Sequence, residues 1–137
     1  MSETLFTKIV AGEIPCHKVY EDEHVFAFLD IGPLAPGHTL LIPKLAVERL
    51  EDVPEEVAAA LGRVLPRLGR AVLQATGVSD YHVVQKNGAL AGQVVPHVHF
   101  HIIPKPADDS GLGMRWRPTQ LESVAGAEMA KRIAAHL

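Results

Sequence analysis

One seven-residue run limits the folds open to this chain more than any other feature. Residues 97–103 read His-Val-His-Phe-His-Ile-Ile, so histidines alternate with apolar residues. Successive side chains of a β-strand point to opposite faces, so this alternation predicts a strand over His97–Ile103 with its three histidines on one face. Val98, Phe100 and Ile102 would then lie on the other face, against a core.

Apolar patterns along the rest of the chain predict helices and further strands. Apolar residues at helical spacing indicate helices, whereas short apolar runs bounded by turn residues indicate strands. We expect helices over Leu5–Ala11, from Pro54 to Gly77 and near the C-terminus, and strands over His17–Glu21, Val25–Leu29, Thr39–Ile42, Tyr81–Lys86 and His97–Ile103. Strands joined by hairpins, with helices between groups of strands, are typical of an α+β fold on an antiparallel sheet.

Two of the predicted helices contain residues that bear on where they begin or break. Pro66 lies inside the long helical pattern and removes a backbone donor, so we expect either a kink there or two shorter helices. Thr119 and Glu122 have the spacing of a capping box, which satisfies free N–H groups at a helix start. A C-terminal helix should follow this box, in a segment that carries Leu121, Val124, Met129 and Ile133.

Composition narrows the class of protein before any site is considered. The 137 residues fit one domain, and 13 basic against 16 acidic residues give a net charge of −3. This acidic balance excludes a nonspecific nucleic-acid binder, which needs a basic surface. Cys16 is the only cysteine, which agrees with a reducing compartment, and the sequence has no signal-peptide pattern and no run of about 18 apolar residues. We therefore expect a cytoplasmic protein that binds neither nucleic acid nor membrane.

The histidines of the alternating run have three competing interpretations. Next-but-one residues of a strand lie about 6.6 Å apart, so all three rings could address one small group such as a phosphate. The run could be a solvent-facing strand, a zinc site, or a catalytic site in which an imidazole attacks phosphorus. No acidic residue lies within the run, which makes a catalytic metal site the less favoured of the last two.

The segment Asn87–Gln93, just before the histidines, favours the catalytic interpretation. It reads Asn-Gly-Ala-Leu-Ala-Gly-Gln, a loop of small residues with an amide side chain at each end. Backbone N–H groups of such a loop can approach an anion closely, and Asn and Gln side chains add neutral donors. A plain hairpin connection could have the same composition. Joined directly to the histidines, however, the loop is more typical of a phosphate cradle.

Together with other segments, the histidine run resembles the histidine triad (HIT) family, and within it the small nucleotide-binding hydrolases. The resemblance spans about residues 5–106 and rests on Phe6–Pro15, Ala27–Ile31, Ala35–Lys44, the pairs Asn87-Gly88 and Gly92-Gln93, and His97–Ile103. It implies one HIT domain over residues 1–137, with a C-terminal tail and helix over about 107–137. The implied fold is α+β and HIT-like, with an antiparallel sheet of about five strands and two main helices.

The resemblance also implies roles for individual residues. His99 would be the nucleophile that forms a nucleotidyl-histidine intermediate, and His101 would hydrogen-bond a phosphate oxygen. His97 and His38 would lie behind His99, orient it and relay protons. Asp30 would bind the ribose hydroxyl groups. The other implied nucleotide contacts are Ile31, Asn87, Gly92, Gln93, Val94, Phe6, Ile9 and Phe28.

Two departures from the family pattern concern a metal site and the leaving group, and a further point concerns the tail. Some relatives hold zinc with a Cys-x-x-Cys pair, a further histidine and the first histidine of the run. Here the first three positions are Thr4, Thr7 and Ala46, so we expect no structural zinc and assign no metal. We also expect no cofactor. Val94 lacks the hydroxyl group that some relatives carry near the leaving group. Trp116 lies in a tail that in relatives approaches the partner's active site, and a homodimer is implied.

The function that the resemblance implies is that of a hydrolase or transferase acting at the α-phosphate of a purine nucleotide. A nucleoside phosphoramidate, such as an adenosine 5′-monophosphate amide, is the expected substrate. Two alternatives stay open from the sequence. One is a dinucleoside polyphosphate hydrolase, which would use the same chemistry at phosphorus. The other is a nucleotide-binding dimer with little turnover.

Overall fold

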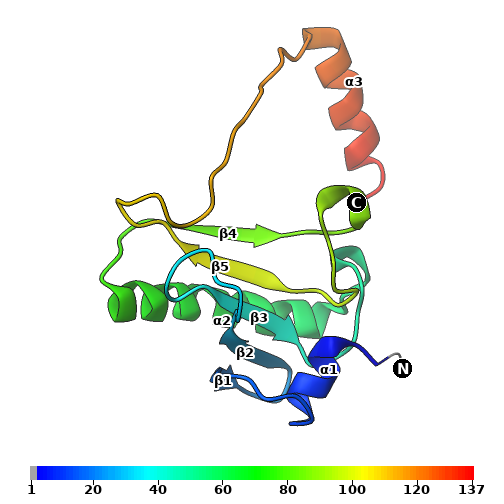
Figure 1. Ribbon diagram of the computed structural model, residues 1–137. Coiled ribbons are helices and arrows are strands. Elements are labelled where there is room, and N and C mark those ends of the chain that lie inside the picture. Colours follow the sequence, from blue (N-terminus) through cyan, green and yellow to red (C-terminus); the bar gives the residue numbers. More distant parts are fainter. Residues whose placement is uncertain (1–2) are drawn as a thin grey trace.

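The short apolar runs form one antiparallel sheet in the computed structural model, which describes residues 3–137 (Figure 1). The spatial order of the strands is β1-β2-β3-β5-β4, and every neighbouring pair is antiparallel. This sheet and its helices confirm the predicted α+β class. The strands are β1 (Lys18–Glu21), β2 (Val25–Leu29), β3 (Thr39–Pro43), β4 (Tyr81–Gln85) and β5 (Phe100–Pro104).

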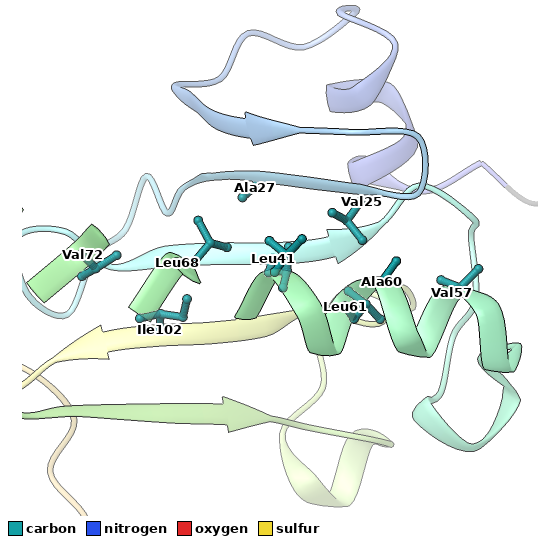
Figure 2. Packing of buried hydrophobic residues seen from close by; sticks show 10 residues of the cluster. Val25, Ala27, Leu41, Val57, Ala60, Leu61, Leu68, Val72 and Ile102 are labelled. Atoms are coloured by element: carbon teal, nitrogen blue, oxygen red, sulfur yellow. The ribbon is translucent and has the colours of Figure 1, made fainter. Parts of the chain in front are cut away.

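The helix α2 (Glu55–Thr76) covers one face of the sheet. Its apolar stripe packs on the inward side chains of β2, β3 and β5, as Figure 2 shows for Leu68, Leu41 and Ile102. The helix continues through Pro66, so the alternative of two shorter helices is wrong. Pro66 is on the exposed side, where water can bind the carbonyl group that the missing N–H leaves free. Neither α2 nor any other helix within residues 3–137 combines the length and apolar content that crossing a bilayer requires.

The opposite face of the sheet carries the short helix α1 (Leu5–Val10), one residue shorter than predicted. Phe6 and Ile9 of this helix pack against a second apolar cluster, which lies on β2 and β3. The helix begins at a capping box, because the Thr4 hydroxyl accepts the backbone N–H of Thr7 at 3.1 Å and the Thr7 hydroxyl accepts that of Thr4 at 2.8 Å. The two faces of the sheet are therefore covered by different elements.

The prediction of a strand over His97–Ile103 is wrong for its first three residues, since β5 begins only at Phe100. Continuing the β3–β5 register would bring Val98 opposite Pro43. Pro43 has no N–H to donate, and its carbonyl oxygen accepts a hydrogen bond from the His97 ring at 2.8 Å. Val98 N–H instead donates to Val47 O at 2.7 Å. The ladder therefore ends, and residues 97–99 form the entry to the strand.

The C-terminal segment extends away from the sheet and ends in α3 (Ser123–Ala134), as Figure 1 shows. The predicted capping box of Thr119 and Glu122 is wrong. Glu122 itself is the N-cap, and its carboxylate accepts the backbone N–H groups of Val124 and Ala125. A longer acidic side chain thus replaces the hydroxyl group expected to begin the helix. Trp116, in the extended part of the tail, is 77% exposed.

Candidate active site

A cavity of about 340 Å³ opens on the α1 side of the sheet. Its apolar wall comes from α1, the end of β2 and the turn after α1. Its polar lining comes from His99 and His101 at the start of β5, with Asp30 after β2 and Lys86 after β4. Nine of the predicted site residues line it, namely Phe6, Ile9, Phe28, Asp30, Ile31, Gly92, Val94, His99 and His101. The structure therefore brings together residues that lie more than 90 positions apart in the sequence.

The ring of His99 is held so that one nitrogen is free. Its Nδ1 lies 2.7 Å from the carbonyl oxygen of His97, which can only accept, so Nδ1 carries the proton of the neutral ring. Nε2 then has an unshared electron pair. Burial lowers the pKa of His99, because the charged ring would have few water molecules around it to stabilise the charge. The Phe6 ring packs against the His99 ring in an edge-to-face arrangement, with the two centroids 5.0 Å apart.

The ring of His101 is fixed in the opposite tautomer through His38. Leu34 N–H donates to His38 Nδ1 at 3.1 Å, which leaves the proton of the neutral His38 ring on Nε2. His38 Nε2–H donates to His101 Nδ1 at 2.9 Å, so His101 carries its proton on Nε2. Burial and the neighbouring rings of His99 and His38 lower the pKa of His101 to about 4. The cavity thus receives an acceptor nitrogen from His99 and a donor nitrogen from His101.

Asp30, His38 and His101 form a group whose donor atoms lie within 4.8 Å of one another, which raises the question of a metal. Binding through His38 Nε2 would need the electron pair of that nitrogen and would move the ring proton to Nδ1. Leu34 N–H already donates to His38 Nδ1, so the two protons would collide. The Oδ1 atom of Asp30 accepts the N–H of Gly32 at 2.8 Å. These contacts describe a hydrogen-bonded histidine pair, and they oppose binding of a metal through His38.

His97 differs from the prediction that all three histidines face one small group. Its side chain is 0% exposed and does not line the cavity. Its Nε2–H donates to Pro43 O at 2.8 Å, and its Nδ1 lies 2.8 Å from the Thr4 hydroxyl. The ring therefore has no nitrogen free to relay protons to His99. The backbone carbonyl of His97, rather than its ring, orients His99.

Asn87 and Gln93, the two amide residues of the loop before β5, differ from the expectation that they contact the nucleotide. Gln93 accepts the N–H of Gly88 at 2.7 Å and donates to Glu48 O at 2.8 Å, while Asn87 accepts the N–H of Leu50 at 2.8 Å. These side chains therefore hold the loop in shape, and neither lines the cavity. Gly88 and Gly92 have φ angles of 92° and 89°, which side chains rarely adopt, so glycine is needed for this turn.

Lys86 and Cys16 line the cavity although sequence reasoning did not assign them to it. Lys86 is exposed and also lines a neighbouring cavity of about 210 Å³ together with Asp30 and His101. The only signal for Lys86 in the sequence is that it lies directly before the Asn87-Gly88 pair. A single lysine at a strand end has no pattern that separates it from an ordinary surface charge.

Comparisons with known proteins agree with this fold and site. The HIT domain profile matches residues 11–108. Adenosine 5′-monophosphoramidase hnt1 of Schizosaccharomyces pombe is 42% identical over 134 residues, which are 94% of this chain and 97% of that protein. Adenylylsulfatase HINT3 of Arabidopsis thaliana is 44% identical over 108 residues, which are 79% of this chain and 55% of that protein. A crystal structure of a HIT family member from Bacillus subtilis, 37% identical, has a TM-score of 0.95 over 99% of this chain and 98% of the other. The chain therefore belongs to the histidine triad family.

Proposed function

We propose that this histidine triad hydrolase cleaves purine nucleoside phosphoramidates at the α-phosphate through a nucleotidyl-histidine intermediate. One observation carries the proposal: the His99 Nδ1–H bond to the His97 carbonyl leaves Nε2 unprotonated at the cavity. A neutral imidazole with a free nitrogen is a competent nucleophile near pH 7. The name of the Schizosaccharomyces pombe relative, an adenosine 5′-monophosphoramidase, supports this substrate class.

The proposed reaction has two steps at phosphorus. In the first, His99 Nε2 forms a bond to the α-phosphorus as the bond to the leaving amine breaks, and the amine takes a proton from solvent in the open cavity. His101 Nε2–H donates to a nonbridging phosphate oxygen and stays neutral. In the second step water attacks phosphorus, the bond to His99 breaks, and the proton that water loses returns to solvent. The products are the nucleoside monophosphate and the free amine.

The nucleotide itself would be bound by both sides of the cavity. We assign the base to the apolar wall, where Phe6, Ile9 and Phe28 supply ring and hydrocarbon contacts. Asp30 would accept hydrogen bonds from the ribose, since its carboxylate lines the cavity with 23% of the side chain exposed. Ile31, Gly92 and Val94 would complete the contacts on the exposed rim.

A dinucleoside polyphosphate is the second candidate substrate, and two observations favour it. Lys86 brings a positive charge to the cavity beside His101, which suits a leaving group that departs as an anion. An anionic leaving group also needs no proton, and burial lowers the pKa of the four site histidines His38, His97, His99 and His101. The Arabidopsis relative, named as an adenylylsulfatase, is consistent with such leaving groups.

Turnover measurements on defined nucleotides test both candidates. Steady-state rates on adenosine 5′-phosphoramidate, a diadenosine polyphosphate and adenylyl sulfate give the preference as a ratio of kcat/KM values. A denaturing quench at alkaline pH in the first turnover, followed by mass spectrometry of peptides kept out of acid, should find a nucleotidyl group on His99, because the P–N bond of such an adduct hydrolyses in acid. An adduct on another residue would overturn the nucleophile, and nucleotide affinity without turnover on any probe would identify a binding protein instead.

We also propose that the protein acts in the cytoplasm as a homodimer. The tail supports an association, because Trp116 and the α3 residues Val124, Met129 and Ile133 are each between 47% and 77% exposed. The single cysteine is consistent with a reducing compartment. Analytical ultracentrifugation of the full chain should give twice the chain mass of 14.8 kDa. A species of one chain mass at micromolar concentration would contradict the dimer.

A further inference from the structure

A buried hydrogen bond joins the start of α1 to the entry of β5. The Thr4 hydroxyl lies 2.8 Å from His97 Nδ1, although the two residues are 93 positions apart in the sequence. Thr4 is 7% exposed and His97 is 0% exposed, so water does not compete for this contact. Neither side chain lines the cavity. The proposed reaction therefore assigns the Thr4 hydroxyl no role, which leaves its buried bond unexplained.

The direction of this hydrogen bond follows from the partners on either side. Pro43 O only accepts, so His97 Nε2 carries the ring proton and Nδ1 is an acceptor. The Thr4 hydroxyl consequently donates to His97 Nδ1, while its oxygen accepts Thr7 N–H. Every polar atom of the His97 ring and of the Thr4 hydroxyl then has a partner. The His97 ring is fixed in one tautomer and in one orientation.

We propose that Thr4 is a positioning residue for the reaction, and that its hydroxyl fixes the nucleophile His99 by fixing His97. The inference rests on the proposed function, because it concerns the residue assigned there as nucleophile. The connection from Thr4 to His99 has two parts. The His97 ring is held between Thr4 and Pro43, and the His97 carbonyl then accepts His99 Nδ1–H at 2.7 Å.

A second contact makes the same connection through the apolar side of α1. Phe6, two residues after Thr4, meets the rings of both His97 and His99 edge-on, with centroids 5.5 and 5.0 Å away. The Thr4 hydroxyl thus holds α1 against the β5 entry, and Phe6 of the same helix packs against the His99 ring. A displacement of α1 would therefore displace the contact that Phe6 makes with His99. Losing the hydroxyl would leave His97 Nδ1 buried without a donor, so the ring would shift to find one. A shift of the His97 carbonyl moves the proton-bearing nitrogen of His99 with it.

The test compares three single variants of the full chain on adenosine 5′-phosphoramidate. Thr4→Val keeps the shape but removes the hydroxyl, and Thr4→Ser keeps the hydroxyl. Thr7→Val is the matched control, because the Thr7 hydroxyl bonds only to the Thr4 backbone at the same helix start. We expect Thr4→Val to lower kcat about ten- to a hundredfold with KM changed less than about threefold, since misplacement by about 1 Å can have such an effect. Thr4→Ser and Thr7→Val should stay within about threefold of the wild-type kcat.

Three outcomes would overturn the inference. Thr4→Val could be folded with unchanged kcat, Thr4→Ser could be as impaired as Thr4→Val, or Thr7→Val could lose as much activity as Thr4→Val. Nitrogen-15 NMR of the wild-type histidine rings gives a measurement that needs no variant. His97 must carry its proton on Nε2, and a proton on Nδ1 would overturn the hydrogen-bond direction.

Failure of the proposed function would look different. In that case the wild type would not turn over the nucleotide, or His99→Asn would turn over as fast as the wild type. Failure of the inference alone would leave a wild-type rate that depends on His99 but not on the Thr4 hydroxyl. The NMR assignment of the His97 ring supports or overturns the Thr4 contact in either case.

Discussion

The two faces of the sheet are made from alternate residues of the same strands, yet they differ in chemistry. On the α2 face, Leu41 and Ile102 are 0% exposed in an apolar cluster. On the other face, Leu40 packs under α1, and its partner His101 hydrogen-bonds His38 beside the cavity. His101 and Ile102 are neighbours in the chain, so a one-residue shift of β5 would exchange core and site. Under the proposed function, the reacting groups lie on the histidine face while the apolar cluster under α2 lies on the other, so mutation should separate activity from stability.

Replacing His99 by Asn should produce the largest effect, and it should fall on activity alone. An Asn amide can still donate to the His97 carbonyl, but it has no nucleophilic nitrogen. We expect kcat to fall by at least about a thousandfold, as for loss of other enzymatic nucleophiles. Rapid-quench kinetics measures the rate, and urea unfolding checks that stability changes by less than about 1 kcal/mol. A variant that keeps a tenth of the wild-type rate would contradict the role of His99.

Leu68→Ala should have the converse effect. Leu68 is 4% exposed on α2 and packs on the strands, so truncation leaves a cavity in the core. Such substitutions lower the free energy of unfolding by about 2–5 kcal/mol. The histidine face has its own contacts, so kcat below the unfolding transition should stay within about twofold. A loss of kcat at a temperature where the variant is fully folded would show that the two faces are coupled.

The fold could be predicted further than the site because strand and helix patterns are local. Val25–Leu29 is a strand with the predicted bounds, and α2 begins one residue after Pro54 and ends one before Gly77. The prediction failed where a distant residue decides the local structure. Pro43, from another strand, ends the β5 ladder and binds the His97 ring. The sequence around His97 has no sign of that contact.

The residues of the site could be predicted from motifs, but their hydrogen-bond partners could not. Spacing identifies Asn87 and Gln93 as amides in a loop, yet only the structure shows that they bond to the backbone of Leu50 and Glu48. Two functions of an amide, binding a ligand and holding a loop, have the same sequence pattern. The bond between Thr4 and His97 likewise depends on how α1 packs against the β5 entry.

Lowering the pH should decrease the free energy of unfolding, by less than Leu68→Ala does and by more than Lys86→Met. Burial lowers the pKa values of His38, His97, His99 and His101 below the unfolded value near 6.5. Between pH 6.5 and about 4, the value for His101, the unfolded chain therefore binds more protons than the native one. Stability should be complete above pH 6.5 and fall below it, by up to about 1.4 kcal/mol per pH unit for each histidine.

Urea unfolding from pH 7.5 to 4 measures this slope. His101→Asn removes one of the histidines and should make the decline with falling pH shallower. An equally steep decline in that variant would mean that other groups cause it. The rate should fall in the same direction, because protonation of His99 removes the electron pair of its Nε2. The acid limb of kcat/KM should therefore lie below pH 6.5, the ordinary histidine value.

The smallest effect should come from Lys86→Met, which changes charge at the cavity without touching the α2 face. Burial is the main cause of the lowered pKa of His99, and the positive charge of Lys86 adds to it. Removing that charge should move the acid limb of kcat/KM to a slightly higher pH. Lys86 is exposed, so the shift should shrink in 1 M salt, where charges are screened within about 3 Å instead of about 10 Å at 0.1 M.

The same variant separates the two candidate substrates. If Lys86 stabilises an anionic leaving group, Lys86→Met should lower kcat/KM for a diadenosine polyphosphate several times more than for adenosine 5′-phosphoramidate. Lys86→Arg keeps the charge and should behave like the wild type on both. An equal loss of kcat/KM on both substrates would mean that the charge of Lys86 does not favour the polyphosphate. Because the change lies on the histidine face, the free energy of unfolding should stay within about 0.5 kcal/mol, which separates a charge effect on the reaction from damage to the fold.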